Sequence, residues 1–285
     1  MSNEAARDRA FGALIGLAMG DAVGTTVEFQ ARDTFAPLTD MVGGGPFKLT
    51  PGEWTDDTSM ALCLADTLIA HQGRVDPRHL LSGFVNWWQH GWNSVTGTCF
   101  DIGTATTQAL SSFLRDGTLI NNADPQMQAN GSIMRLAPVV LCARSEQEAV
   151  ELALAQGQVT HAAPVPQACC EELARLLWGL AETGDEPAAF EEARRIERNA
   201  IISSGHAPAT LQAAIWSVAT TSNPRDAILA AANLGDDADT VAAVAGQIAG
   251  ARYGLAALDR QWLQRLAWRD DILQRGEDLW ALRSR

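Results

Sequence analysis

Two short clusters combine carboxylates with threonine hydroxyls. The first is Thr-Asp-Asp-Thr at residues 55–58, and the second is Asp-Asp-Ala-Asp-Thr at residues 236–240. Each stands directly before an apolar segment with helical spacing, so each is expected at a helix N-terminus. Asp and Thr cap such ends by accepting hydrogen bonds from free amides, and the helix dipole favours their charge. One capping residue meets that need, however, and adjacent carboxylates repel one another unless a positive charge lies between them.

Divalent cations would supply that positive charge. Oxygen ligands from Asp and Thr suit hard cations such as Mg²⁺ or Mn²⁺ and disfavour Zn²⁺. Two such clusters facing each other could hold two ions. The spacing alone leaves a metal site and elaborate capping both open.

The elements that must position these clusters are predicted to be helices. Sustained alternation with hairpin signals, internal repeats and long Pro/Gly/Ser linkers are all absent from the sequence. We therefore expect an all-α fold in a single compact multi-helix domain over residues 1–285. Apolar residues spaced three and four apart predict helices near residues 5–22, 57–71, 77–90, 102–115, 145–158, 165–183, 186–200, 208–219, 224–232, 239–253 and 269–283.

Two of these predicted helices carry stripes of small residues at every fourth position. The stripes are Gly12, Gly16, Gly20 and Gly24 in one helix, and Ala238, Ala242, Gly246 and Gly250 in the other. Glycine inside a helix costs about 1 kcal/mol relative to alanine, so a stripe of it indicates a face that another backbone approaches closely. If the two helices pack on each other, Asp21 and Glu28 come near residues 236–239.

Four irregular segments carry polar residues that a helical core does not need. Loops held by a rigid scaffold are the usual place for chemistry. The four segments are residues 24–56, 91–104, 121–132 and 233–240.

Three tryptophans form a local cluster in the sequence. We expect Trp87, Trp88 and Trp92 to pack in the core, with stacking on adenine as the alternative.

Composition limits the class of protein. A net charge of −13 and a pI near 4.7 argue against binding to nucleic acid. The five cysteines show neither CxxC spacing nor grouping with histidine, so we expect buried thiols without a disulfide framework or zinc site. The negative charges of Glu4 and Asp8 do not fit a signal peptide, whose N-terminal region is positively charged. Asp21 interrupts the first apolar run before it reaches the ~20 residues that are needed to span a bilayer. We expect a cytoplasmic protein without a membrane partner.

Five motifs occur in order along the chain and together resemble the ADP-ribosylglycohydrolase family, most closely its nitrogenase-related branch. The resemblance covers roughly residues 8–256. The motifs are Gly-Asp-Ala-Val-Gly to Val-Glu-Phe at 20–29, Gly-Gly-Gly at 43–45 followed by 51–58, Asn-Gly-Ser-Ile-Met-Arg at 130–135, Thr-His at 160–161, and Gly-Asp-Asp-Ala-Asp-Thr at 235–240.

The resemblance implies an all-helical fold with a binuclear Mg²⁺ or Mn²⁺ centre. The family pattern Asp-x-Asp-Thr selects Asp237 over its neighbour Asp236 as a ligand. The metal ligands that the resemblance implies are Thr55, Asp56, Asp57, Asp237, Asp239 and Thr240.

The resemblance also implies catalytic roles for Glu28 and Asp101. By its residues alone, Glu28 fits a surface carboxylate, and Asp101 fits an ordinary helix N-cap as well as a group acting on the ribose ring. His161 follows a predicted helix, where a histidine often bonds free carbonyls, but the family places it against the nucleotide.

Glycine-rich segments complete the expected substrate site. Glycine lets backbone amides approach an anion closely, so residues 43–45 and 130–132 fit a phosphate cradle. The expected substrate-binding residues are Gly43, Gly44, Gly45, Asn130, Gly131, Ser132, Met134 and His161.

These expectations combine into a reaction at the anomeric carbon of a ribose. A metal pair can bind the ribose hydroxyls and lower the pKa of bound water, while Glu28 and Asp101 transfer protons. The resemblance implies an ADP-ribosylated protein as substrate, with arginine as the linked side chain and ADP-ribose as the product. Two alternatives stay open: a catalytically silent ADP-ribose-binding protein, and a metal-dependent hydrolase of another ADP-ribosyl linkage.

Overall fold

The computed structural model describes residues 3–284, and these residues form helices joined by loops. Two isolated bridges, Gly44 with Leu49 and Ala129 with His206, are the β-type pairings in this described part of the chain. The all-helical prediction is therefore confirmed. The helices are α1 (Asn3–Gly24), η1 (Thr25–Val27), α2 (Asp56–Ala70), α3 (Pro77–His90), α4 (Thr104–Asp116), α5 (Pro138–Cys142), α6 (Glu146–Gln158), α7 (Pro164–Thr183), α8 (Ala188–Ala193), η2 (Arg198–Ala200), α9 (Ala207–Ala219), α10 (Pro224–Ala232), α11 (Ala238–Tyr253), η3 (Leu255–Ala257), α12 (Arg260–Arg265), α13 (Arg269–Ala281) and η4 (Leu282–Ser284).

One predicted helix is interrupted. Residues 186–200 form only the short α8 and η2, and between them the backbone carbonyl of Ile196 accepts from the indole of Trp216 at 3.0 Å. The short helices α5 and α12 were not predicted, since five or six residues are too few for the apolar period to show.

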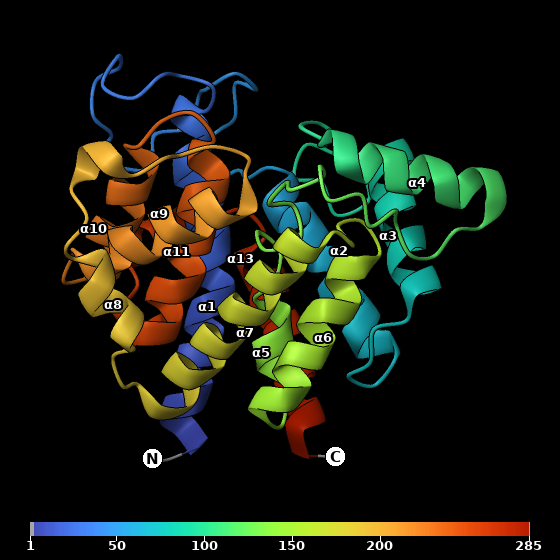
Figure 1. Cartoon of the computed structure of the whole chain (residues 1–285). Coiled ribbons are helices and arrows are strands. Elements are labelled where there is room, and N and C mark those ends of the chain that lie inside the picture. The colour runs from blue at the N-terminus through green and yellow to red at the C-terminus, as the bar shows by residue number, and fades with distance from the viewer. Residues whose placement is uncertain (1–2, 285) are drawn as a thin grey trace.

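The centre of the molecule is the pair α1 and α11, which run antiparallel and lie side by side in Figure 1. A Cβ added to any of four α1 glycines would lie within 2.4 Å of a backbone oxygen of α11, so the two backbones touch without side chains between them. The close backbone approach that each stripe indicated is confirmed, and the structure shows that the two stripes meet each other. The opposed pairs are Gly12 with Gly250, Gly16 with Gly246, Gly20 with Ala242, and Gly24 with Ala238.

Helix α1 is the core helix of the fold. By length and composition the stretch Asn3–Val27 could cross a membrane, but 94% of its most apolar window is buried inside the protein. This stretch is longer than the apolar run seen in the sequence, which ended at Asp21. The helix continues through Asp21, whose side chain is itself fully buried. Helices α2, α7, α9, α10 and α13 pack around the central pair, while α3 and α4 lie at one edge (Figure 1).

Candidate active site

The C-terminal end of α1 joins the two threonine/aspartate clusters. Oδ1 of Asp21 accepts from the backbone N (2.8 Å) and Oγ1 (2.9 Å) of Thr55. Oδ2 of Asp21 accepts from the backbone N (3.0 Å) and Oγ1 (2.6 Å) of Thr58. Asp21 therefore caps α2 from a neighbouring helix. The N-cap residues of α2 and α11, Thr55 and Asp237, make no capping hydrogen bond through their own side chains. Capping by the N-cap side chains themselves therefore does not explain the two clusters.

The two clusters face each other across the α1–α11 contact. Oγ1 of Thr55 lies 3.4 Å from Oδ2 of Asp239, and Oγ1 of Thr240 donates to Oδ1 of Asp57 at 3.3 Å. The structure thus brings together side chains from residues 55–57 and 237–240. Asp237 lines the cleft described below, whereas Asp236 is exposed and has a left-handed backbone (φ 53°).

Burial and mutual repulsion dominate the electrostatics of these clusters. Burial is the main cause that raises the pKa values of Asp56, Asp57 and Asp239 well above the usual range, and neighbouring carboxylates raise them further. Oδ2 of Asp57 is buried without a hydrogen-bond partner among the described residues. Buried carboxylate oxygens without partners are costly unless a cation joins them. The donor set is oxygen only, which fits Mg²⁺ or Mn²⁺.

Glu28 and Asp101 lie beside the second cluster. One carboxylate oxygen from each of Glu28, Asp101 and Asp239 falls within 4.8 Å of the other two. Glu28 is 3% exposed, so it is not the surface carboxylate that its sequence context allowed. Asp101 has a left-handed backbone (φ 59°), and Gly103 is the N-cap of α4, so the N-cap interpretation of Asp101 is wrong. Burial raises the pKa of both carboxyls, that of Asp101 to about 7. The charge of Asp237 adds to both shifts, whereas hydrogen bonds with Asp56 and Glu28 reduce the shift of Asp101.

Reciprocal backbone bonds hold Glu28 at the cleft. The residue after it, Phe29, donates its N–H to the carbonyl of Asp236 at 2.8 Å, and the N–H of Asp236 donates to the carbonyl of Gln30 at 2.7 Å. These bonds join the loop after η1 to the loop before α11. The catalytic residue predicted near the N-terminus is thereby positioned by a loop more than 200 residues away in the sequence.

A cleft of about 280 Å³ opens over these carboxylates. It continues into a second cavity of about 360 Å³, because Thr104, Ala105, Ala129 and Gly205 line both. The second cavity is completed by Gln126, Met127, Gln128 and His206. The other residues lining the first are Glu28, Phe29, Asp56, Asp101, Gly103, Thr106, Asn130, Gly131, Met134, His161, Asp237 and Thr240.

Asn130 supports the acidic cluster. Its Nδ2 donates to Oδ2 of Asp237 at 2.6 Å and lies 2.9 Å from Oγ1 of Thr210. The structure therefore gives Asn130 a direct part in orienting Asp237, in addition to its position on the cleft wall. Gly131 is needed beside it, because a Cβ there would lie 2.7 Å from Cε1 of His161.

His161 is held as a neutral imidazole. Burial lowers its pKa to about 3. Oγ1 of Thr160 lies 2.8 Å from Nδ1 of His161 and accepts from Nη2 of Arg135 at 2.8 Å. The hydroxyl of Thr160 can accept from Arg135 and donate its own hydrogen to Nδ1. In that tautomer the ring hydrogen is on Nε2, where His161 would offer an N–H donor at the cleft.

Arg135 is the buried cation of this network. It is 0% exposed, its Nε donates to Oε1 of Gln156 at 2.8 Å, and its guanidinium lies 4.7 Å from the ring centroid of Phe84. Neither Arg135 nor Asp21 was predicted to have a role in the site. Arg135 lies within the motif at 130–135, and Asp21 was expected only to come near the second cluster. The sequence therefore singled out both segments, but it gave no signal for the residues that these two side chains contact.

Four predicted substrate-binding residues do not line the cleft. A Cβ on Gly43 would lie 2.6 Å from the carbonyl of Leu49, and one on Gly45 would lie 2.2 Å from that of Thr25. Close backbone packing therefore accounts for Gly43 and Gly45, and all three residues of the turn have positive φ values of 69°, 87° and 67°. Ser132 is fully buried away from the cleft. The residues concerned are Gly43, Gly44, Gly45 and Ser132.

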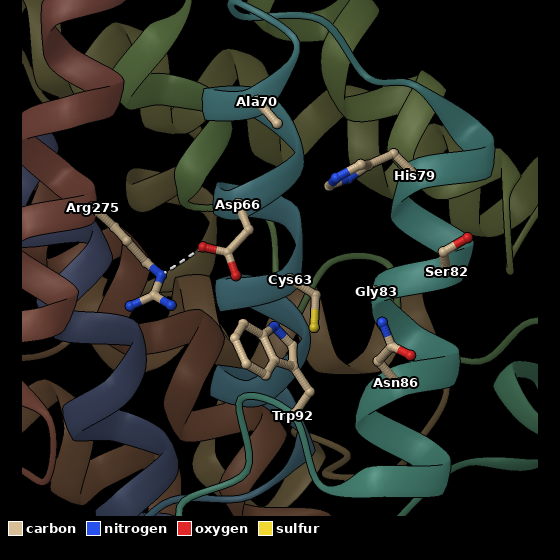
Figure 2. A pocket seen from close by; sticks show the side chains of 9 residues that line it. All are labelled: Cys63, Asp66, Ala70, His79, Ser82, Gly83, Asn86, Trp92 and Arg275. Atoms are coloured by element: carbon tan, nitrogen blue, oxygen red, sulfur yellow. Dashed lines mark hydrogen bonds and ion pairs between the residues drawn. The ribbon is translucent and has the colours of Figure 1, made fainter.

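A separate cavity of about 370 Å³ lies between α2, α3 and α13. Figure 2 shows Asp66 paired with Arg275 on its wall, at 2.8 Å. Asn93 bonds to both side chains, so the principal charges of this cavity are already satisfied by each other. Trp92, which was expected in the core, is 58% exposed and lines this cavity. No predicted site residue lies among its lining residues.

Known proteins resemble the chain over nearly its whole length. Residues 2–285 match the family model for ADP-ribosylglycohydrolase. The chain is 46% identical to ADP-ribosylarginine hydrolase Tri1 of Pseudomonas putida (strain GB-1), over 98% of this chain and 80% of that protein. It is 31% identical to ADP-ribosyl-[dinitrogen reductase] glycohydrolase of Rhodospirillum rubrum, over 93% and 92%. A solved structure titled ADP-ribosylglycohydrolase-related protein complex superposes with a TM-score of 0.84 at 34% identity, over 98% and 99% of the two chains. With the motifs gathered at one cleft, these matches show that the chain belongs to the ADP-ribosylglycohydrolase family of hydrolases.

Proposed function

We propose that the protein hydrolyses the N-glycosidic bond between ADP-ribose and an arginine side chain of a modified protein. The observation that carries the proposal is the meeting of two Thr/Asp clusters with Glu28 and Asp101 at one cleft. The arginine linkage is supported by the relatives from Pseudomonas putida and from Serratia proteamaculans (strain 568), both named ADP-ribosylarginine hydrolases, at 46% and 44% identity.

We further propose that two divalent cations, Mg²⁺ or Mn²⁺, bind between the clusters. Their ligands would be Thr55, Asp56, Asp57, Asp237, Asp239 and Thr240. The unpartnered Oδ2 of Asp57 and the crowding of buried carboxylates support this arrangement. Bound cations would orient the ribose hydroxyls and lower the pKa of a bound water.

Glu28 and Asp101 are proposed to transfer the protons of the reaction. Water adds to C1 of the ribose while the bond from C1 to the arginine nitrogen breaks. One proton must therefore leave the water, and one must reach the leaving nitrogen. Burial and the neighbouring carboxylates raise the pKa of both side chains, which favours their holding a proton near neutral pH.

The continuous cleft and second cavity suggest how ADP-ribose lies. The ribose bonded to arginine would occupy the carboxylate end, and the nucleotide would extend past Ala129 and Gly205 into the second cavity. The Nε2–H of His161 would donate to a substrate oxygen along that path. The proposed setting is the reducing cytoplasm, in keeping with five free cysteines.

The test is release of ADP-ribose from an arginine-modified protein, with Mn²⁺, with Mg²⁺ and with a chelator. Asp57→Asn and Asp239→Asn are the test variants, and Asp236→Asn, an exposed neighbour, is the matched control. Metal-dependent release that survives only in the control supports the proposal. Tight binding of ADP-ribose without release would favour the silent binder, and release only from another linkage would favour the second alternative. If the protein neither binds ADP-ribose nor releases it from a modified protein, the proposal is overturned.

A further inference from the structure

Three phenylalanines from two loop segments, residues 28–55 and 91–103, lie together, and one of them, Phe29, lines the cleft. The ring centroids of Phe29 and Phe47 are 6.3 Å apart, and those of Phe47 and Phe100 are 4.9 Å apart. We call these three residues the aromatic rim. Phe29 is 67% exposed, the largest value among the exposed large hydrophobic side chains of the described residues. Phe47 and Phe100 are half-buried, and an exposed apolar side chain grouped with others commonly marks a binding surface.

The backbone holds Phe29 in this exposed position. Its φ of 62° is in the left-handed region, which is uncommon for a residue with a bulky side chain. The hydrogen bond from its N–H to the carbonyl of Asp236 keeps it there. Strained residues of this kind persist where the surrounding structure holds them, often at ligand sites.

The aromatic rim flanks the two proposed proton-transfer residues. Phe29 directly follows Glu28 and lines the same cleft, and Phe100 directly precedes Asp101. The second cavity shares Ala129 and Gly205 with the cleft, but none of the three phenylalanines lines it. With the nucleotide in that second cavity, the group bonded to C1 of the ribose is left on the side of the aromatic rim.

We propose that the aromatic rim binds the arginine side chain and adjoining residues of the ADP-ribosylated protein, with the guanidinium group against the face of Phe29. The inference rests on the proposed function and names the part of the chain that recognises the leaving group. A guanidinium is planar and cationic, so it stacks on aromatic faces. The carbonyl oxygens of the Glu28 and Asp101 carboxyl groups beside the rim can accept hydrogen bonds from the same guanidinium.

The decisive experiment separates the leaving group from the nucleotide. Phe29→Leu keeps the apolar volume but removes the aromatic face, and Phe29→Tyr restores it. For Phe29→Leu we expect kcat/KM on ADP-ribosylarginine to fall about 5- to 30-fold. The Kd of free ADP-ribose should stay within about 2-fold of the wild-type value, and Phe29→Tyr should recover most of the activity.

A double variant extends the test to the polypeptide. Phe47→Leu combined with Phe100→Leu should lower kcat/KM on a modified protein more than on free ADP-ribosylarginine. Trp92→Leu removes an exposed aromatic from the separate cavity and is the matched control, with no change expected on either substrate. Thermal unfolding of each variant checks that the fold is intact.

Each remaining outcome is decisive. A parallel loss of ADP-ribose affinity in Phe29→Leu would mean that the rim binds the nucleotide, and the inference would be overturned. Wild-type kinetics for Phe29→Leu and for the double variant would overturn it as well. Absence of release by the wild-type protein would instead refute the proposed function, so the two failures are distinguishable.

Discussion

Replacing Gly20 by alanine tests whether the α1–α11 contact positions the site. The new Cβ would lie 2.0 Å from the carbonyl oxygen of Ala242, and ordinary contact begins at 3.4 Å, so the two backbones would have to separate by about 1.4 Å. No rotamer change relieves the clash, because the opposing atom is backbone. Overpacking costs up to about 3 kcal/mol and the better helix propensity of alanine returns about 1. We expect a net loss of about 2 kcal/mol in the free energy of unfolding.

The effect on activity should exceed the effect on stability. The next residue, Asp21, orients Thr55 and Thr58 through four hydrogen bonds. A shift of about 1 Å in such groups can cost about 100-fold in rate, so we expect a loss of that order in kcat for Gly20→Ala under conditions where it remains folded.

The assay is urea unfolding together with ADP-ribose release. Gly179→Ala is the control, because an added Cβ there meets nothing within 4 Å, and this variant should gain up to about 1 kcal/mol. Adding Ala242→Gly to Gly20→Ala should not restore stability, since the clash involves the carbonyl oxygen of Ala242 and not its methyl group. Equal stabilisation by Gly20→Ala and Gly179→Ala, with full activity, would refute the reasoning.

Three further predictions follow from the site. Asp57→Asn should weaken Mn²⁺ binding, measured by calorimetry, at least about 10-fold. The same change should make the metal-free protein more stable, because it removes a buried carboxylate with a raised pKa. Unchanged Mn²⁺ affinity would show that Asp57 is not a metal ligand. Burial lowers the pKa of His161 from 6.5 to about 3, so the stability it contributes is present above pH 6.5 and is lost as the pH falls toward 3. His161→Gln should therefore flatten the dependence of unfolding free energy on pH in that window by about 1.4 kcal/mol per pH unit, and parallel curves for variant and wild type would contradict the buried neutral imidazole. Thr160→Val should lower kcat/KM about 10-fold, and Thr160→Ser should retain the wild-type value. ¹⁵N NMR would report whether the ring hydrogen of His161 is on Nε2 in each variant. The same tautomer in wild type and in Thr160→Val would show that Thr160 does not set it.

The sequence by itself determined most of the helices, the close backbone approach along two of them, and the segments where chemistry lies. Apolar spacing is a local signal, so α3 and α10 begin and end where they were predicted. The four-residue stripes of Gly and Ala predicted a close backbone contact, because glycine at those positions has no other use in a helix. That contact brings Asp21 toward the second cluster, and the motifs indicated the family.

The tertiary structure decided which atoms meet, because those contacts join residues far apart in the chain. Asp21 caps α2 from another helix, and Asn130 reaches Asp237 from a loop 107 residues away, which no local pattern encodes. The left-handed backbone of Asp101 and the packing of the turn at 43–45 depend in the same way on what surrounds them. A sequence pattern indicates which residues of one helix or loop are buried or exposed. The hydrogen-bond partner of a buried polar atom depends instead on which other segments the packed helices bring within hydrogen-bonding distance.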